Sequence, residues 1–372
     1  MTHESGKGGQ PSPVTIFIQA LVTRDWRFIT FTVAGSGTAA LIAIFQFAVL
    51  SSFIAASAAV PRYLNADIWV SAYGVSAFDF GYPIPSDYGA ALVSYFPGAS
   101  YRRVLVAFAP WNSPSGHKSN VVVVGVDGIE APLRTLIVDK SELDDLRMNA
   151  RNHHLPEIGQ TRFDSAIATD GLATFLGVPY VISNFDDAAT ALGVENDYVS
   201  FIAIDTQQSH GQLREIIHTI NSKYPEITVL TAHDFERQTA TYWLFRTGAG
   251  AAIFLAAILA AVIMVLFLVS GVSRFISQYT SDFLTIVGLG YGADLVLKIT
   301  LVVSVLLAVS PVLLAALALP FMEFVTDSML PWVDVKPLDL GFGCILALVG
   351  AGIAWRTSNA RIVQFDLAGV FR

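Results

Sequence analysis

The side chains that could do acid–base or metal chemistry are few in this sequence. His153 and His154 are the only adjacent histidines among seven, and Glu142, Asp144 and Asp145 form a short acidic run. A zinc site needs further ligands at a recognisable spacing, and the sequence around these residues supplies none. We therefore expect no structural metal, and we interpret the acidic run as a solvated surface.

Two glycine-rich segments have a composition found in nucleotide-binding loops but lack the required spacing. The segment 6–9 (GKGG) is not a Walker A motif, and the segment 288–292 (GLGYG) does not follow a strand of a βαβ unit. We interpret the second segment as a turn. Because no serine-hydrolase or zinc-protease motif occurs either, we expect no enzyme activity and no cofactor in this chain.

The elements that would have to position any such residues are mostly apolar. Hydrophobic residues make up 53% of the chain and charged residues 14%, with a mean hydropathy of +0.56. Four stretches contain no charged residue: 28–61, 247–273, 299–322 and 340–355. Since about 20 apolar residues cross a bilayer, we predict transmembrane helices over 28–60, 244–273, 299–322 and 338–356.

A cleaved signal peptide is the alternative for the first of these helices. Residues 56–58 (ASA) resemble a cleavage site. The uncharged stretch is, however, much longer than the apolar region of a signal peptide, which has about 7–15 residues. We therefore expect a retained membrane helix.

Lysine and arginine residues in the short loops predict the orientation. Segments 1–27, 274–298 and 356–372 carry eight of them, whereas the loop over 323–337 carries only Lys336. We therefore expect a multi-pass inner-membrane protein with both termini in the cytoplasm. Its tail over 357–372 and its loop over 274–298 are then cytoplasmic, and the regions 61–243 and 323–337 are periplasmic.

The periplasmic segment alternates strand-like and helical patterns, which predicts an α+β domain between the first and second membrane helices. Runs of β-branched and aromatic residues predict strands over 66–72, 104–111, 120–126, 198–205 and 227–231. A helix predicted over 208–224 joins the last two strands in a β-α-β unit. Between Arg62 and Arg246 the sequence has 21 acidic and 13 basic residues, so we expect no nucleic-acid partner.

The predicted membrane helices carry small residues at a four-residue spacing that permits close packing. These residues are Gly248, Ala252, Ala256 and Ala260 in the second helix, and Gly343, Ala347 and Ala351 in the fourth. The spacing indicates a helix interface within one chain or between two copies, although alanine and glycine are also common in membrane helices. We expect Pro311 and Pro320 to kink or end the third helix. Since the four uncharged stretches also lack histidine, any transport must take its energy from a partner.

The loop over 274–298 is the most informative part of the sequence. Ile276, Tyr279, Phe283, Ile286 and Val287 recur at intervals of three and four residues, which predicts an amphipathic helix before the glycine-rich turn. Such a helix could pass force from a cytoplasmic partner to the periplasmic domain, or it could rest on the inner leaflet. We also expect an interfacial amphipathic helix between Pro13 and residue 27.

This layout resembles the MacB/FtsX-type (type VII) permeases of ABC transporters, and among them most closely the DevC permeases. Four segments carry the resemblance: 109–114 (APWNSP) with the following strand, 197–243 ending in HDFERQTATYW, 283–298 (FLTIVGLGYGADLVLK), and 365–372 (FDLAGVFR). The resemblance covers nearly the whole chain, and the order of helices and domain is its most specific part.

The resemblance implies a permease subunit of mechanotransmission type, in which a separate cytoplasmic ATPase binds ATP and Mg²⁺. It also implies a homodimer that works with a periplasmic membrane-fusion protein and an outer-membrane channel to export a hydrophobic or lipid-like substrate. The residues expected to contact the ATPase are Phe283, Leu284, Ile286, Val287, Gly288, Gly290 and Tyr291. The alternatives are an FtsX-like regulator that activates a periplasmic partner without transport, and a membrane sensor whose outer domain binds a ligand.

Overall fold

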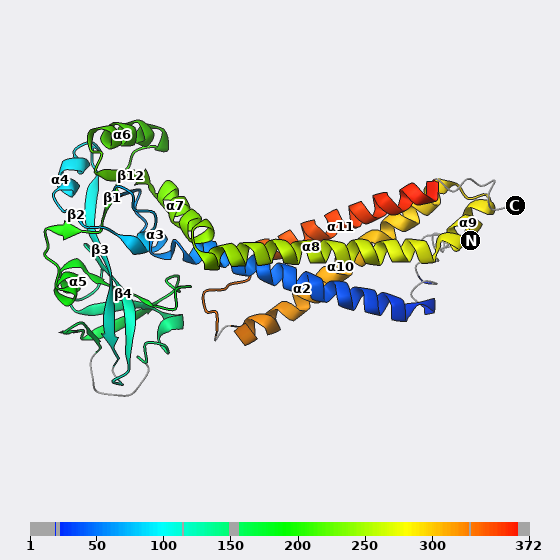
Figure 1. Cartoon of the computed structure of the whole chain (residues 1–372), viewed down its shortest axis with the longest axis horizontal. Coiled ribbons are helices and arrows are strands. Elements are labelled where there is room, and N and C mark those ends of the chain that lie inside the picture. Colours follow the sequence, from blue (N-terminus) through cyan, green and yellow to red (C-terminus); the bar gives the residue numbers. More distant parts are fainter. Residues whose placement is uncertain (1–18, 20–22, 114, 149–155, 327–328, 364–372) are drawn as a thin grey trace, which may run out of the picture. The chain divides into compact units, whose positions relative to one another are not determined.

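The computed structural model describes residues 19, 23–113, 115–148, 156–326 and 329–363 (Figure 1). The chain forms two compact units, each of which is described by itself. The helical unit comprises the residues up to Leu50, Ile253–Thr326, and the residues from Asp334 onward. The sheet unit comprises Ser51–Ala252 and Asp327–Val333.

Four helices in the described part of the chain are long and apolar enough to cross a membrane by length and composition. They are α2 (Trp26–Ala56), α8 (Gly248–Gln278), α10 (Ala293–Thr326) and α11 (Pro337–Val363). The helix expected over 28–60 is divided, because α2 ends at Ala56 and a short helix α3 (Ala59–Leu64) follows. The amphipathic helix expected ahead of α2 lies largely outside the described residues.

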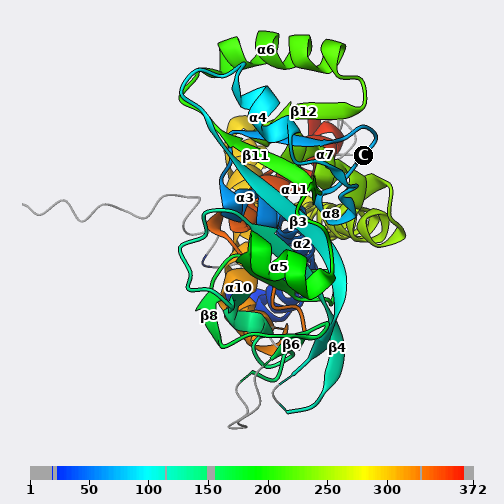
Figure 2. The same ribbon diagram turned by 90° about the vertical axis from the view of Figure 1, so that its left-hand side faces the viewer.

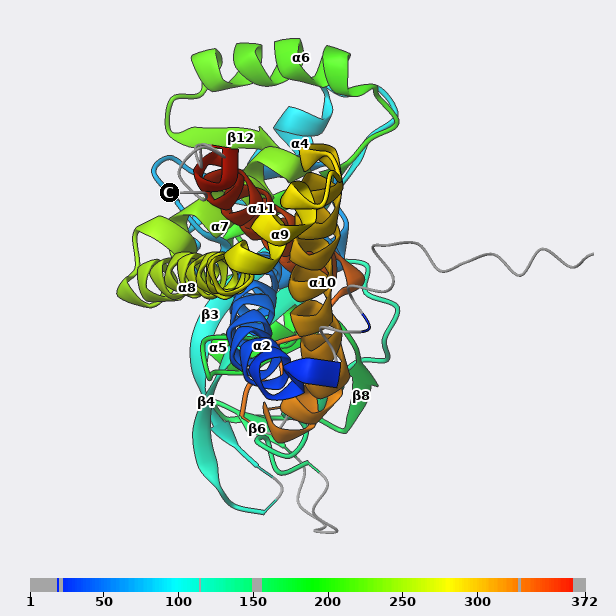
Figure 3. The same ribbon diagram turned by 90° about the vertical axis from the view of Figure 1, so that its right-hand side faces the viewer.

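Small side chains allow the long helices of the helical unit to pack closely (Figure 3). An ideal Cβ at Gly37 of α2 would lie 2.7 Å from Leu314 Cδ2 of α10, and one at Gly343 of α11 would lie 2.5 Å from Ile44 Cγ1 of α2. Helix α10 continues through Pro311 and Pro320 to Thr326, so neither proline ends it.

A ten-stranded sheet is the centre of the sheet unit, within the residues that the structure describes. Its main path runs in the order β12-β1-β11-β3-β4-β9-β5-β8, with β6 and β7 attached beside β3, and β2 and β10 form a separate pair. The strands are β1 (Ile68–Ala72), β2 (Ile84–Pro85), β3 (Ser100–Asn112), β4 (Lys118–Val126), β5 (Thr135–Asp139), β6 (Glu157–Ile158), β7 (Thr161–Arg162), β8 (Ser165–Thr169), β9 (Tyr180–Asn184), β10 (Tyr198–Val199), β11 (Phe201–Asp205) and β12 (Ile227–Thr231).

The β-α-β unit predicted over 198–231 is present in a split form. Strands β11 and β12 are joined by α6 (His210–Lys223), but each pairs antiparallel with β1, which lies between them. Ile68 of β1 faces Ile204 on one side and Thr231 on the other. The first strand of the sheet unit, β1, therefore lies between β11 and β12, the last two strands in the sequence.

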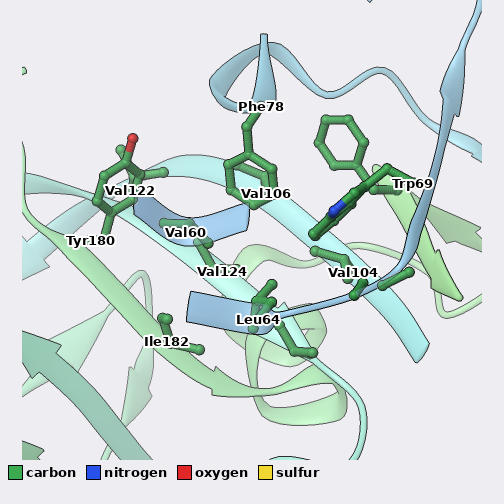
Figure 4. Close-up of a cluster of buried hydrophobic side chains, with 14 of the residues drawn as sticks. Val60, Leu64, Trp69, Phe78, Val104, Val106, Val122, Val124, Tyr180 and Ile182 are labelled. Carbon is green, nitrogen blue, oxygen red and sulfur yellow. The ribbon is translucent and has the colours of Figure 1, made fainter. Parts of the chain in front are cut away.

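Side-chain alternation along the strands gives the sheet two apolar faces. On one face, α4 (Tyr88–Val93), α5 (Phe185–Leu192) and α6 pack on side chains such as Ile68, Val70 and Ile202 (Figure 2). On the other face, α3, the short helix η1 (Phe78–Phe80) and α7 (Ala232–Phe245) pack around Trp69 and Val104 (Figure 4).

Candidate functional site

Helix α9 (Thr280–Gly288) is nearly continuous with α8, and Tyr279 is the only residue between them. The Tyr279 N–H donates to the Phe275 carbonyl at 3.2 Å, and the Phe283 N–H donates to the Tyr279 carbonyl at 3.0 Å. Backbone hydrogen bonds therefore cross the break between the two helices. The amphipathic helix predicted in the loop over 274–298 thus consists of the end of α8 together with α9.

An apolar cluster holds α9 in place. Ile276, Tyr279 and Phe283 are buried among side chains of α10 and α11, including Val296, Ile299 and Ala354. The Tyr279 hydroxyl also donates a hydrogen bond to the Asp25 carboxylate. Because these contacts involve several helices, α9 is fixed to the end of the helical unit.

The turn after α9 is closed by two backbone hydrogen bonds. The Gly290 N–H donates to Val287 O at 3.0 Å, and the Tyr291 N–H donates to Ile286 O at 3.3 Å. Gly290 has a φ of +89°, a left-handed conformation that glycine adopts without the penalty of a side chain. This pattern is the Schellman motif, a defined way to end a helix. The glycine-rich segment 288–292 is therefore a turn, as the sequence predicts.

The turn exposes two large apolar side chains. Leu289 is 73% exposed and Tyr291 is 53% exposed. We call residues Leu289–Tyr291 the tip. Gly290 and Tyr291 are among the residues expected to contact an ATPase, whereas the exposure of Leu289 was not predicted. Its position between two turn glycines was the available signal.

The remaining predicted contact residues lie on different sides of α9. Phe283 is only 1% exposed, because the apolar face of the helix is turned toward α10. Leu284, Ile286 and Val287 are half-buried, and Gly288 is exposed. Phe283 therefore belongs to the packing that supports the tip rather than to its exposed surface.

The two predicted small-residue stripes also have different surroundings. In α11, Gly343, Ala347 and Ala351 are all buried, and Gly343 lies against Ile44. In α8, Gly248 and Ala252 are exposed, Ala256 is half-buried and Ala260 is buried. The α11 stripe thus packs within the helical unit, whereas the first half of the α8 stripe is exposed.

In the sheet unit, α7 is joined to the sheet by a buried carboxylate. Asp79 of η1 accepts hydrogen bonds from the Tyr180 hydroxyl of β9 and, at 2.9 Å, from Trp243 Nε1 of α7. Burial raises the pKa of Asp79, whereas the two hydrogen bonds act in the opposite direction. The Trp243 ring also stacks on Phe80. Trp243 is therefore part of the cluster around Asp79.

Two further contacts fasten α7. Arg62 of α3 forms an ion pair with Glu236 at 2.9 Å, and Gln238 Nε2 donates to the Val75 carbonyl at 2.7 Å. Helix α7 is thus connected to α3, to the loop after β1 and to β9. The attachment of α7 therefore involves several parts of the sheet unit.

The junction between α7 and α8 depends on a glycine. An ideal Cβ at Gly250 would lie 2.1 Å from the Trp243 carbonyl oxygen and 2.7 Å from Leu244 Cα. Thr247 caps the start of α8 by accepting from the Gly250 N–H at 3.2 Å. The first turn of α8 therefore lies directly against the last turn of α7.

The expectation that Glu142, Asp144 and Asp145 form a solvated surface is wrong for Glu142. Its side chain points inward from η2 (Lys140–Glu142), and the residue is 4% exposed. It accepts a hydrogen bond from the Thr174 N–H at 3.3 Å. The pKa of the Glu142 carboxyl is raised from 4.5 to about 7, chiefly by burial; the Thr174 hydrogen bond acts in the opposite direction, and the nearby Asp145 and Asp139 carboxylates add to the increase.

Glu142 should make the stability of the sheet unit depend on pH. Between pH 4.5 and 7 the unfolded chain loses the Glu142 proton before the folded chain does, so the stability falls as the pH rises. We expect Glu142→Gln to resemble the wild type at pH 4 and to be about 2–3 kcal/mol more stable at pH 8. Urea unfolding of the full chain at both pH values measures this difference.

The exposed Glu130 provides the control for this prediction, because the same change of side chain is made at the surface. Glu130→Gln should change the free energy of unfolding by less than about 0.5 kcal/mol at either pH. Equal effects of the two substitutions at pH 8 would contradict the inward placement of Glu142.

Within the described residues, no three His, Cys, Asp or Glu side chains are grouped as metal ligands. His153 and His154 lie outside the described residues. The buried carboxylates Asp79 and Glu142 each act as hydrogen-bond acceptors, for Trp243 Nε1 and the Thr174 N–H respectively.

Comparison with known proteins identifies similar structures but no sequence relative. No protein-family model and no curated protein matches the sequence. The chain is similar to the periplasmic region of MacB from Actinobacillus actinomycetemcomitans, with 8% identity and a TM-score of 0.34 over 46% of this chain and 92% of that one. It is also similar to the extracellular domain of the noncanonic ABC-type transporter YknZ from Gram-positive bacteria, with 10% identity and a TM-score of 0.31 over 44% of this chain and 98% of that one.

Proposed function

We propose that this chain is the membrane subunit of an ABC exporter of mechanotransmission type. The observation that carries the proposal is the tip, where Leu289 and Tyr291 expose apolar surface. The turn follows α9, which is held in place by the apolar cluster that contains Phe283. Exposed apolar side chains on a rigid turn are suited to binding a partner protein. The proposed partner is a cytoplasmic ATPase subunit that binds ATP and Mg²⁺.

Helix α8 supports this proposal because it connects the tip with α7. It has 31 residues and is therefore about 46 Å long at 1.5 Å per residue. Its last turn continues into α9 through Tyr279, and its first turn lies against α7 at Gly250. In the proposed mechanism, a displacement of the tip is passed along α8 to α7, and α7 is bonded to the sheet unit through Trp243 and Glu236.

The composition of the long helices also supports an external energy source. The uncharged stretches contain no aspartate, glutamate, lysine, arginine or histidine to carry a proton or ion through the membrane. In the proposed arrangement both termini are in the cytoplasm, and two copies of the chain bind two ATPase subunits. The sheet unit works with a periplasmic membrane-fusion protein and an outer-membrane channel to export a hydrophobic or lipid-like substrate.

Tyr291→Glu tests the proposed ATPase contact. The substitution places a charge in the apolar contact surface, and we expect it to weaken binding of the ATPase about tenfold or more. The chain would be co-expressed with the proteins encoded by the neighbouring reading frames and recovered by an affinity tag, and any bound ATPase and its activity would be measured. Membrane insertion should be unchanged, because Tyr291 is exposed at the end of the helical unit.

Tyr82→Glu is the matched control, since Tyr82 is an exposed tyrosine of the sheet unit. It should leave ATPase binding unchanged. Normal binding by Tyr291→Glu would contradict the assigned contact surface, and the absence of any bound ATPase would contradict the transporter class. Recovery of a cell-wall hydrolase in place of a fusion protein would favour the regulator over the exporter.

A further inference from the structure

A groove of about 500 Å³ lies between α2 and α8 in the helical unit, where the two helices run side by side (Figure 3). The floor of the groove carries few side-chain atoms, because Gly35 of α2 and Gly271 of α8 are among its lining residues. An ideal Cβ at Gly271 would lie 2.8 Å from Thr32 Cγ2, so the helix backbones approach closely there. Aromatic rings of Phe28, Phe31 and Phe267 form much of its wall.

Two arginines line one end of this groove. Arg27 directly precedes the uncharged stretch of α2, and Arg274 directly follows that of α8. The Arg274 guanidinium lies 5.6 Å from the centre of the Phe28 ring, and the Arg27 guanidinium lies 5.7 Å from that of Trp26. Within the described residues neither arginine forms an ion pair with a carboxylate, so two positive charges are available for an anion.

The length of the groove along α2 fits a molecule with one charged end and a long apolar part. Ser36, another lining residue, is nine positions along α2 from Arg27, which corresponds to about 13 Å along the helix axis. The arginines mark the headgroup level, because they bound the uncharged stretches, and the aromatic wall extends from there toward the hydrocarbon. A soluble anion would leave this wall uncovered.

We propose that the groove is a binding site for an anionic phospholipid. The Arg27 and Arg274 guanidiniums hold the phosphodiester, for which their fixed planar donors are well suited. An acyl chain lies along Phe31, Gly35 and Phe267. This site does not require the chain to be an ABC subunit, because it rests on the groove and its two charges alone.

Other occupants fit these charges less well. The residues 1–22 contain Glu4 as their single carboxylate, and the apolar segment 13–22 contains none, so that segment offers no partner for the two arginines. A second copy of the chain would bring its own Arg27 and Arg274 to a contact at this end of the helices. The charge pattern therefore favours lipid.

The test is retention of lipid by the full-length chain in detergent, measured by native mass spectrometry after titration with phosphatidylglycerol or phosphatidylcholine. We expect phosphatidylglycerol to bind with one lipid per chain and at least tenfold more tightly than phosphatidylcholine. The double substitution Arg27→Gln/Arg274→Gln should weaken phosphatidylglycerol binding about tenfold. Gly35→Leu, which fills the groove without a change of charge, should weaken both lipids' binding.

The matched control is Lys298→Gln/Arg356→Gln, which removes two exposed positive charges of α10 and α11 near the same end of the spans. It should leave phosphatidylglycerol binding unchanged. Equal losses in both double variants, or equal binding of the two lipids, would show diffuse attraction and overturn the site. Displacement of the lipid by millimolar inorganic phosphate alone would overturn the role of the apolar wall. Thermal unfolding of each variant confirms that losses are not caused by misfolding.

Discussion

Gly250→Ala is expected to destabilise the junction between α7 and α8 by about 2–3 kcal/mol. The added Cβ would meet the Trp243 carbonyl oxygen at 2.1 Å and Leu244 Cα at 2.7 Å. Both atoms belong to the backbone, so no rotation of a side chain relieves the contact. One helix must move away from the other, and the Thr247 cap on the Gly250 N–H is then lost.

Two measurements would detect the separation of α7 from α8. Thermal unfolding of the full chain should begin at a lower temperature, and trypsin should cleave faster after the exposed Arg246, which lies between the two helices. In the complex with the proposed ATPase, binding should be normal, because the tip is unaltered. The response of the sheet unit to ATP should be lost, which limited proteolysis with and without ATP would report.

Gly248→Ala provides the control for this prediction. Gly248 lies two residues earlier in the same helix, and an ideal Cβ there meets no atom within 4 Å. The substitution should change the free energy of unfolding by less than about 0.5 kcal/mol. If Gly250→Ala behaves in the same way as Gly248→Ala, the close contact between α7 and α8 is not a feature of the protein.

Asp79→Ala is expected to cost about 3–4 kcal/mol of stability in the sheet unit. The substitution leaves the Tyr180 hydroxyl and the Trp243 Nε1–H without their acceptor. An unsatisfied buried donor costs about 1–3 kcal/mol, and two are created here. Chemical unfolding of the full chain, followed by tryptophan fluorescence, measures the loss.

Tyr180→Phe separates the hydrogen bonds from simple packing. It keeps the ring, removes one donor and should cost about 1 kcal/mol. Combined with Asp79→Ala, it should add little, because the double variant no longer contains the orphaned Tyr180 hydroxyl. Strictly additive losses in the double variant would show that the two groups act independently.

The sequence predicted the elements that depend on local composition. Long uncharged stretches are sufficient to indicate the four long helices, and β-branched runs indicated strands such as β4 and β12 to within a few residues. The turn at Gly290 was also recognisable, since glycines are common where a helix must end.

Long-range contacts could not be predicted in the same way. The pattern of 198–231 indicated β-α-β but gave no sign that β1 lies between the two strands. The partners of Asp79 are 101 and 164 residues away, so nothing beside it in the sequence indicates its burial. Gly250 and Gly248 are the same residue type in the same run, and only the fold distinguishes the crowded one from the open one.

The spacing of apolar residues predicted the amphipathic helix α9, but it did not predict what its apolar face contacts. A period of three to four residues identifies an apolar face without saying whether that face meets the protein's own helices or a partner. Phe283 is on the face that meets α10, and the exposed apolar surface comes from the turn, where no periodicity applies.

The place of β1 has a consequence for synthesis. Residues of β1 leave the ribosome early, just after the first span, but both neighbours of this strand come more than a hundred residues later, ending at Thr231. Pairing over such separations is slow, because the long intervening chain must first be closed into a loop. The sheet is therefore incomplete until β12 has been synthesised, and the nascent segment presents open strand edges during that interval. A chain truncated before Ile227 would retain such an edge permanently and would be a substrate for proteases rather than a smaller functional domain.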